Sequence, residues 1–260
     1  MDDFIFWRDL LRGVIMKVLL INGSPHIHGC THRALSEVAH ALNADGIDTE
    51  IIHIGNQPIR GCQACGMCRK SDLGLCIFGD DPVNVIIKKM EECNAMIVGS
   101  PVHFAGLTGS ITSLMDRVFY ATLGFPHKLA ASIVTCRRAG ATTALDQMNK
   151  YFMFHNMPVI SSVYWNMAFG NTPKEIEQDE EGLLIMRSLG HNMAYYLKCQ
   201  KAAKDAGILP PLEEKIVRTN FIRELKTAPK EIPNQNPEYK NFAPYFTSYN
   251  QVNKEYQDED

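Results

Sequence analysis

The sequence predicts an α/β fold, built on a doubly wound five-stranded parallel sheet of strand order 2-1-3-4-5. Strand-like apolar runs alternate with helix-like stretches along the first 200 residues, and short turn clusters separate them. The first such run, Val18 to Ile21, is continuously apolar, as expected of a strand covered by helices on both faces. A cysteine-rich loop insertion and a C-terminal extension add to this minimal unit.

The elements follow from the periodicity of apolar residues. Strands are predicted at 17–22, 49–54, 95–99, 131–135 and 158–163. Helices are predicted at 32–44, 82–92, 108–121, 142–154 and 180–204; in the last of these, Leu183, Met186, Leu189 and Met193 recur at helical spacing. A further helix is predicted at 211–225.

Three segments are predicted from these boundaries. Residues 1–15 are expected to be an N-terminal extension, because Met16 runs directly into the first strand. Residues 16–204 form the main domain, which includes the cysteine loop 55–81 and a polar insertion at 164–179. Residues 205–260 form a C-terminal helix and a polar tail. Long loops inside a domain are usually functional, so the two insertions are candidate sites.

Composition excludes several classes of function. The chain has 260 residues, 45% of them hydrophobic, and a formal net charge of −3, so no basic field attracts nucleic acid or anionic lipid. No apolar run approaches the ~20 residues that span a bilayer. Asp2 and Asp3 stand where a signal peptide carries positive charge. We therefore expect a cytoplasmic protein without nucleic-acid or membrane partners.

The first strand ends in a glycine-containing loop that opens a helix. Free backbone N–H groups and the positive end of the helix dipole suit a phosphate there. The nucleotide P-loop pattern fails because Cys30 stands where lysine is needed, and the G-x-G-x-x-G fingerprint is absent. The alternative is a helix start with an incidental glycine. Candidate phosphate-binding residues are Ser24, His26, Gly29, Cys30 and Thr31.

The third strand runs into the loop Ser100 to Gly109. In a sheet of this order, strands one and three flank the switch point, where flavodoxin-like folds bind FMN. The candidate ring-binding residues are Pro101, Val102, His103 and Phe104. His103 is also the nearest candidate for a proton donor; the alternative for His103 and Phe104 is loop packing.

A third loop, after strand four, reaches the same crevice with Arg137, Arg138, Ala139 and Gly140. Two guanidinium groups and free N–H groups can stabilise negative charge on a reduced flavin, or receive the phosphates of a nicotinamide cofactor. The alternative is a solvated pair of surface arginines.

Together the three loops resemble those of the NADPH-dependent FMN reductase-like flavoproteins of the flavodoxin superfamily, over roughly residues 16–204. The resemblance implies a flavodoxin-like fold, bound FMN and NAD(P)H as co-substrate. The sequence departs from the family where His26 replaces a common Arg, Cys30 a common Asn and His103 a frequent Tyr. Tyr164 and Trp165 are similar to a subgroup that forms homo-oligomers with flavin near the interface, which implies a homodimer or homotetramer.

Four of the eight cysteines spell C-x2-C-x2-C-x7-C: Cys62, Cys65, Cys68 and Cys76. One loop can thereby present three thiolates to a [4Fe-4S] cluster, and the fourth cysteine completes the ligand set. The spacing resembles the compact motif of iron-sulfur flavoproteins, a branch of the same family. Free or redox-active thiols and a zinc site are the alternatives. Cys93, Cys136 and Cys199 are expected to be packing residues.

The predicted function is an FMN-binding oxidoreductase that passes electrons between a [4Fe-4S] cluster, FMN and an external redox partner, either a small molecule or a protein. Two rivals remain open: a cluster-free NAD(P)H-dependent reductase of FMN, quinones or nitro compounds, and a non-enzymatic electron carrier or redox sensor. The carrier or sensor belongs to a different class of function from the two enzymes, and a zinc-stabilised binding module is a third rival.

Overall fold

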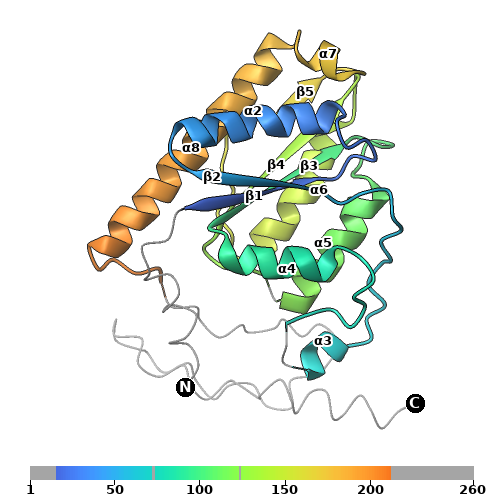
Figure 1. The fold of residues 1–260 in the computed structure, drawn as a ribbon, viewed down its shortest axis with the longest axis vertical. Coiled ribbons are helices and arrows are strands. Elements are labelled where there is room, and N and C mark those ends of the chain that lie inside the picture. Colours follow the sequence, from blue (N-terminus) through green and yellow to red (C-terminus); the bar gives the residue numbers. More distant parts are fainter. Residues whose placement is uncertain (1–15, 72–73, 123, 212–260) are drawn as a thin grey trace, which may run out of the picture. The chain divides into compact units, whose positions relative to one another are not determined.

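The computed structural model describes residues 16–71, 74–122 and 124–211. The chain divides into two compact units, Met1–Leu209 and Pro210–Asp260. Pro210 and Pro211 are described in the second unit, and the first is a five-stranded parallel sheet with helices on both faces (Figure 1). The predicted N-terminal extension 1–15, nearly all of the predicted helix 211–225 and the polar tail lie outside the described residues.

The strand order β2-β1-β3-β4-β5 confirms the predicted topology. The strands are β1 (Lys17–Asn22), β2 (Asp48–His53), β3 (Ala95–Pro101), β4 (Leu129–Cys136) and β5 (Met167–Phe169). All neighbouring strands are parallel, and Val18 lies opposite Thr49 on one side and Ala95 on the other. The carboxyl ends of β1, β3 and β4 therefore lie along one edge of the sheet.

The predicted position of the fifth strand, 158–163, is wrong. Val159 forms only an isolated parallel bridge to Ala130. The chain then leaves the sheet and returns as β5, opposite Val134–Cys136. The Ser162 hydroxyl donates to the Tyr164 carbonyl at 2.7 Å and accepts from the Tyr164 N–H at 3.3 Å. This local turn competes with the ladder, which apolar periodicity alone does not reveal.

Two helical layers enclose the sheet (Figure 1). Helices α2 (Cys30–Ala44) and α8 (Glu180–Asp205) cover one face; α4 (Val83–Glu92), α5 (Gly109–Thr122) and α6 (Ala141–Phe154) cover the other. Short helices α3 (Met67–Lys70) and α7 (Pro173–Ile176) lie in the two insertions. Along β1, Val18 and Leu20 pack toward α2 and α8, whereas Leu19 and Ile21 pack toward the other layer. The sheet is buried on both faces, as its apolar runs predict.

Helices α2 and α8 approach closely because Gly190 has no side chain. A β-carbon there would lie 2.7 Å from Ala41 Cβ and 2.8 Å from the Val38 carbonyl oxygen. At the start of α8, the Asp179 carboxylate accepts the N–H of Gly182 at 2.9 Å and that of Phe169 in β5 at 2.6 Å. One side chain thus caps α8 and attaches β5.

Among the described helices, none has the length and apolar character to cross a bilayer.

Candidate functional site

The loop after β1 folds around a buried side chain, Asn22. Its carboxamide oxygen accepts the Ser24 N–H at 3.1 Å, and its amide group donates to the Ile27 carbonyl at 3.1 Å. The Ser24 hydroxyl in turn accepts the His26 N–H at 3.1 Å. Sequence reasoning missed Asn22, although a polar residue at the end of an apolar strand is a usable signal. These bonds hold the loop in one shape ahead of α2.

The start of α2 provides uncapped backbone N–H groups. Gly29 occupies the cap position, no side chain among the described residues caps the helix, and its first turn has no acidic residue. Peptide N–H groups at such a helix start, with the positive end of the dipole, bind anions. Cys30 lies here with its sulfur 3.6 Å from the Gly170 carbonyl oxygen, and burial raises the pKa of its thiol. The raised pKa favours the neutral thiol, so Cys30 adds no negative charge at this helix start.

The two predicted hydroxyl groups already form hydrogen bonds within the protein, Thr31 with another hydroxyl and Ser24 as an acceptor. The Thr31 side chain is fully buried and bonds the Thr135 hydroxyl of β4 at 2.9 Å. The Ser24 side chain is also buried, and its oxygen accepts from His26. Thr31 can therefore contribute its backbone N–H rather than its hydroxyl, while His26 is exposed at the rim. Thr135 of β4, which binds the start of α2 through Thr31, was missed by sequence reasoning.

The loop after β3 forms a tight turn that projects an aromatic ring. His103 and Gly106 exchange two backbone hydrogen bonds, each of 2.9 Å. Between them, Phe104 and Ala105 have positive φ values of 48° and 59°, as in the hairpin turns that favour Asn-Gly. Such a conformation strains residues with a side chain, and strain of this kind concentrates at functional sites. The Phe104 ring is fully exposed, and His103 is exposed beside it.

The loop after β4 packs directly on the loop after β3. Gly140 has a φ of +89°, and a β-carbon there would lie 2.7 Å from Ala105 Cα. Pro101 and Val102 lie at the base of this contact, where the Val102 N–H donates to the Thr135 carbonyl at 2.9 Å. Arg137, Arg138 and Ala139 are exposed. All three loops are thus linked at one edge of the sheet.

This edge has the chemistry that a flavin mononucleotide needs. The uncapped start of α2 suits the phosphate, and an exposed aromatic ring with two guanidinium groups lies on the neighbouring loops. The two loops pack so closely at Gly140 that a side chain there would clash with Ala105. The residues of these three loops therefore fit a flavin mononucleotide.

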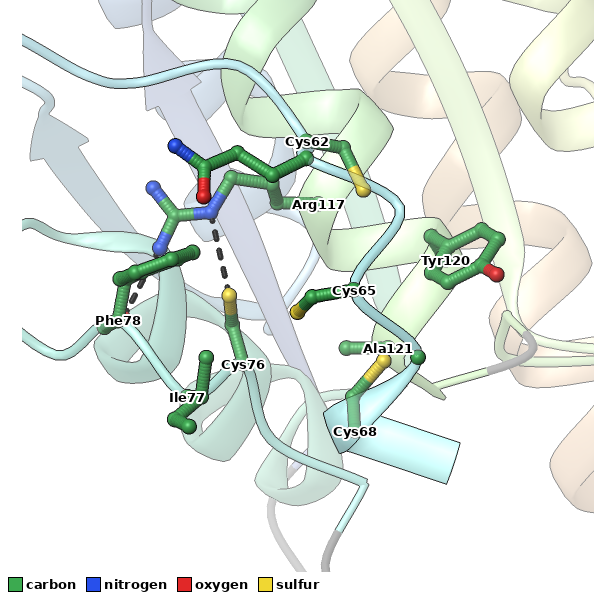
Figure 2. A pocket seen from close by; sticks show the side chains of 11 residues that line it. Cys62, Cys65, Cys68, Cys76, Ile77, Phe78, Arg117, Tyr120 and Ala121 are labelled. Atoms are coloured by element: carbon green, nitrogen blue, oxygen red, sulfur yellow. Dashed lines mark hydrogen bonds between the residues drawn. The ribbon is translucent and has the colours of Figure 1, made fainter. Parts of the chain in front are cut away.

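The four predicted cysteine ligands line one hollow of about 20 Å³ beside α5 (Figure 2). Cys62 and Cys65 are exposed, whereas Cys68 in α3 and Cys76 are half-buried. Arg117 and Tyr120 of α5 also line this hollow. Burial raises the pKa of the Cys68 thiol. The structure thus gathers all four cysteines, which are spread over 15 residues of the chain, around one small space.

The number and type of these donors fit an iron-sulfur cluster, which is held by four cysteine thiolates. In the part of the chain that the structure describes, no three His, Cys, Asp or Glu side chains come close enough to hold a single metal ion. A cube of four irons spreads its four ligands further apart than one zinc ion does. The remaining cysteines differ: Cys93 and Cys136 are buried as predicted, but Cys199 is exposed, so its predicted packing role is wrong.

A doubly wound sheet with a phosphate-type loop at the β1–β3 switch point is a flavodoxin-like fold. A family model described as NADPH-dependent FMN reductase matches residues 16–172. The chain belongs to this family and is a flavin-dependent oxidoreductase.

Two curated relatives are named iron-sulfur flavoprotein. One, from Methanocaldococcus jannaschii, is 33% identical over 195 residues, which are 72% of this chain and 100% of the relative. Another, from Archaeoglobus fulgidus, is 31% identical over 172 residues, 64% of this chain and 83% of the relative. Among solved structures, RosB with bound 8-demethyl-8-formylriboflavin-5'-phosphate is 12% identical, with a TM-score of 0.55, 87% of this chain covered and 100% of that chain. This last likeness supports the fold.

Proposed function

We propose that the protein is an iron-sulfur flavoprotein, in which a [4Fe-4S] cluster held by Cys62, Cys65, Cys68 and Cys76 exchanges electrons with FMN and an external redox partner. The observation that carries this proposal is the single hollow lined by all four cysteines. The names of the curated relatives support it. The partner is a small molecule or a protein, and NAD(P)H is the proposed co-substrate, in keeping with the family description.

The flavin is assigned to the three linked loops. The start of α2, with Ser24, His26, Gly29, Cys30 and Thr31, is assigned to the phosphate, because its N–H groups are uncapped. The loop of Pro101, Val102, His103 and Phe104 and the loop of Arg137, Arg138, Ala139 and Gly140 are assigned to the ring.

When bound, FMN supplies hydride and one-electron chemistry. The chain positions the ring, and the two exposed guanidinium groups favour negative charge on it. His103, exposed on its turn, is the proposed proton donor.

The proposal is tested by the absorption spectrum, iron and acid-labile sulfide of protein purified without oxygen. About four irons per chain are expected for a [4Fe-4S] site. Cys65→Ala is expected to lose the iron and keep the flavin, while Cys199→Ala, which removes an exposed cysteine elsewhere, keeps both. Flavin without iron in the wild-type protein, or equal iron in both variants, would contradict the cluster assignment.

Two alternatives make different predictions. A cluster-free NAD(P)H-dependent reductase of FMN, quinones or nitro compounds is favoured by the family description. It predicts steady NADPH oxidation by protein freed of iron. An electron carrier or redox sensor is favoured by the exposure of Cys62 and Cys65. It predicts reversible reduction by a carrier protein without turnover of small molecules.

We also propose a homodimer or homotetramer in the cytoplasm. Tyr164 and Trp165 stand next to each other, their ring centroids 4.9 Å apart, and are 54% and 57% exposed. Neighbouring exposed aromatic rings are common in subunit interfaces. None of the eight cysteines pairs in a disulfide in the structure, which agrees with a reducing compartment. Light scattering tests the oligomer, and a monomer would overturn the interfacial role of the two rings.

A further inference from the structure

Arg117 is among the largest fully buried side chains of the described protein, and it points from α5 into the cysteine loop (Figure 2). Its side chain is 1% exposed. Burial of a guanidinium group is costly unless its donors are paired. The carboxylate of Asp81, itself 2% exposed, forms a buried ion pair with it. Burial opposes the charge, but Asp81 and Cys76 more than offset this and raise the pKa of Arg117.

The other donors of Arg117 bind both ends of the cysteine segment. Nη1 donates to the carbonyl of Arg60, two residues before Cys62, at 3.3 Å. Nη2 donates to the carbonyl of Phe78, two residues after Cys76, at 2.9 Å. One side chain of the rigid helical layer therefore fixes where this loop begins and ends.

The remaining donor, Nε, lies 3.3 Å from the sulfur of Cys76 and donates to it (Figure 2). Hydrogen bonds to cluster sulfurs and nearby charge set the reduction potential of a cluster. A hydrogen-bond donor and a positive charge stabilise the reduced state of a cluster, because that state carries more negative charge, and they therefore raise the reduction potential. Arg117 is therefore placed to act on the electronic state of the site as well as on its shape.

We propose that Arg117 is a positioning residue of the proposed cluster site: it fixes both ends of the cysteine loop on α5 and raises the reduction potential through its N–H bond to Cys76. This inference rests on the proposed function. Arg60 is the matched control in the same loop. Its guanidinium group contacts Asp80 at 3.0 Å and the Phe78 ring at 4.5 Å, and these contacts do not include a cysteine.

The first measurement is the midpoint potential of the reconstituted holoprotein, by anaerobic redox titration of the wild type, Arg117→Gln and Arg60→Gln. In Arg117→Gln the ratio of reduced to oxidised cluster at a fixed potential is expected to fall about tenfold, which is a shift of about 59 mV for one electron. Arg60→Gln is expected to match the wild type. An unchanged potential in Arg117→Gln at full iron content overturns the proposal.

Arg117→Gln leaves the Asp81 carboxylate buried without its partner, so a second variant avoids a simple folding failure. The double variant Arg117→Gln, Asp81→Asn removes both charges of the ion pair, and Asp81→Asn alone is its control. The lowered potential is expected in the double variant and not in Asp81→Asn. The same potential in both would overturn the role of the Nε–H donor.

The second measurement needs no iron. Hydrogen exchange of the thiol-form protein is followed in peptides that cover residues 60–71 and 74–81. These are expected to exchange faster in the double variant than in the wild type, while peptides of α2 and α8 are unchanged. Equal exchange overturns the loop-fixing role. Wild-type protein without iron would refute the proposed cluster alone, and the exchange data would still decide the role of Arg117 in the loop.

Discussion

Gly23 allows the first loop to lie close to α5 and β3 because glycine has no side chain. A β-carbon on Gly23 would fall 2.0 Å from Ile111 Cγ1 of α5 and 2.9 Å from the Gly99 carbonyl oxygen. The Gly23 N–H donates to that same oxygen at 2.8 Å, and its carbonyl accepts from the Thr108 hydroxyl at 3.2 Å. Glycine is needed here for close approach, not for an unusual backbone angle.

Gly23→Ala is therefore expected to destabilise the protein by about 1–3 kcal/mol, the usual cost of overpacking a dense site. Urea unfolding followed by circular dichroism measures the effect. Gly109→Ala is the matched control, because a β-carbon there meets nothing within 4 Å. It is expected to change the free energy of unfolding by no more than ~0.5 kcal/mol. Equal effects of the two substitutions would contradict the steric explanation.

His155 gives the protein a pH dependence on the acid side. Its ring lies 4.7 Å from the Phe119 ring, and burial lowers its pKa from the ordinary value of 6.5. The unfolded chain therefore takes up a proton at a higher pH than the folded protein does. The neutral His155 side chain therefore contributes fully to stability above about pH 6.5. This contribution is lost as the pH falls through the lower pKa of His155 in the folded protein.

His155→Phe is expected to flatten the stability profile below about pH 6.5, since phenylalanine keeps the ring contact and cannot be protonated. Thermal unfolding over a pH series measures it. His40→Gln, which removes an exposed histidine of α2, is expected to retain the wild-type slope. A steeper acid loss in His155→Phe would refute this account.

Residue identity alone predicted part of the site. That the four cysteines gather in one place could be predicted from their close spacing, and the structure places all four around one hollow. Arg117 and Asp81 could not, since they lie 36 residues apart and meet only when α5 packs against the loop. Thr135 was hidden for the same reason, because its partner Thr31 is 104 residues away.

At the scale of elements, Asp179 joins the last strand to the last helix. Its carboxylate caps Gly182 at the start of α8 and binds the Phe169 N–H of β5. Since β5 has only three residues, this side-chain bond is a large share of what attaches it. The preceding Thr172 caps α7 in the same way, accepting the Glu175 N–H at 3.3 Å.

Asp179→Ala is expected to cost more than the ~1 kcal/mol typical of a lost helix cap, because two N–H groups lose their acceptor. Denaturant unfolding gives the free energy, and hydrogen exchange at Phe169 shows whether β5 detaches. Glu180→Gln, one residue further, is expected to change stability by at most ~0.5 kcal/mol. A cost for Asp179→Ala no greater than that of the control would contradict the double role.

The elements themselves were largely predictable, because the central strands β1, β3 and β4 are mostly apolar and buried, and the long helices have an apolar stripe. Bounds of α2, α4, α5, α6 and α8 differ from expectation by two residues or fewer. The prediction of the fifth strand was wrong because the apolar residues Val159 and Ile160 pack beside the sheet without continuing as a strand. The strand that pairs with β4 is instead Met167–Phe169. The periodicity of apolar residues indicates which residues are buried, but not which segments pair as strands.

At the scale of the molecule, the two apolar cores lie on the two faces of the sheet, and the cysteine loop lies at the margin of one of them. Half-buried Cys68, Leu75 and Cys76 pack against that core from outside. Most residues of the two large buried clusters belong to the strands and the long helices, and none of the four cysteines of the hollow is fully buried.

Iron removal by a chelator is therefore expected to leave a cooperatively folded protein that still binds FMN, with changes in hydrogen exchange confined to the cysteine loop. Far-ultraviolet circular dichroism before and after chelation measures this, together with flavin titration. Loss of cooperative unfolding in the iron-free protein would show instead that the site is a structural metal centre.

Helix α5 touches both proposed redox sites. Ile111, near its start, packs under Gly23 of the first loop, and Arg117 lies six residues further along, in the wall of the cysteine hollow. At 1.5 Å per residue, these two points are about 9 Å apart along the helix axis. A hydrogen-bonded helix neither stretches nor shortens on the timescale of turnover. The spacing between the first loop and the cysteine hollow is therefore fixed by this one helix, and FMN and a cluster would be held at these two places by a common rigid support.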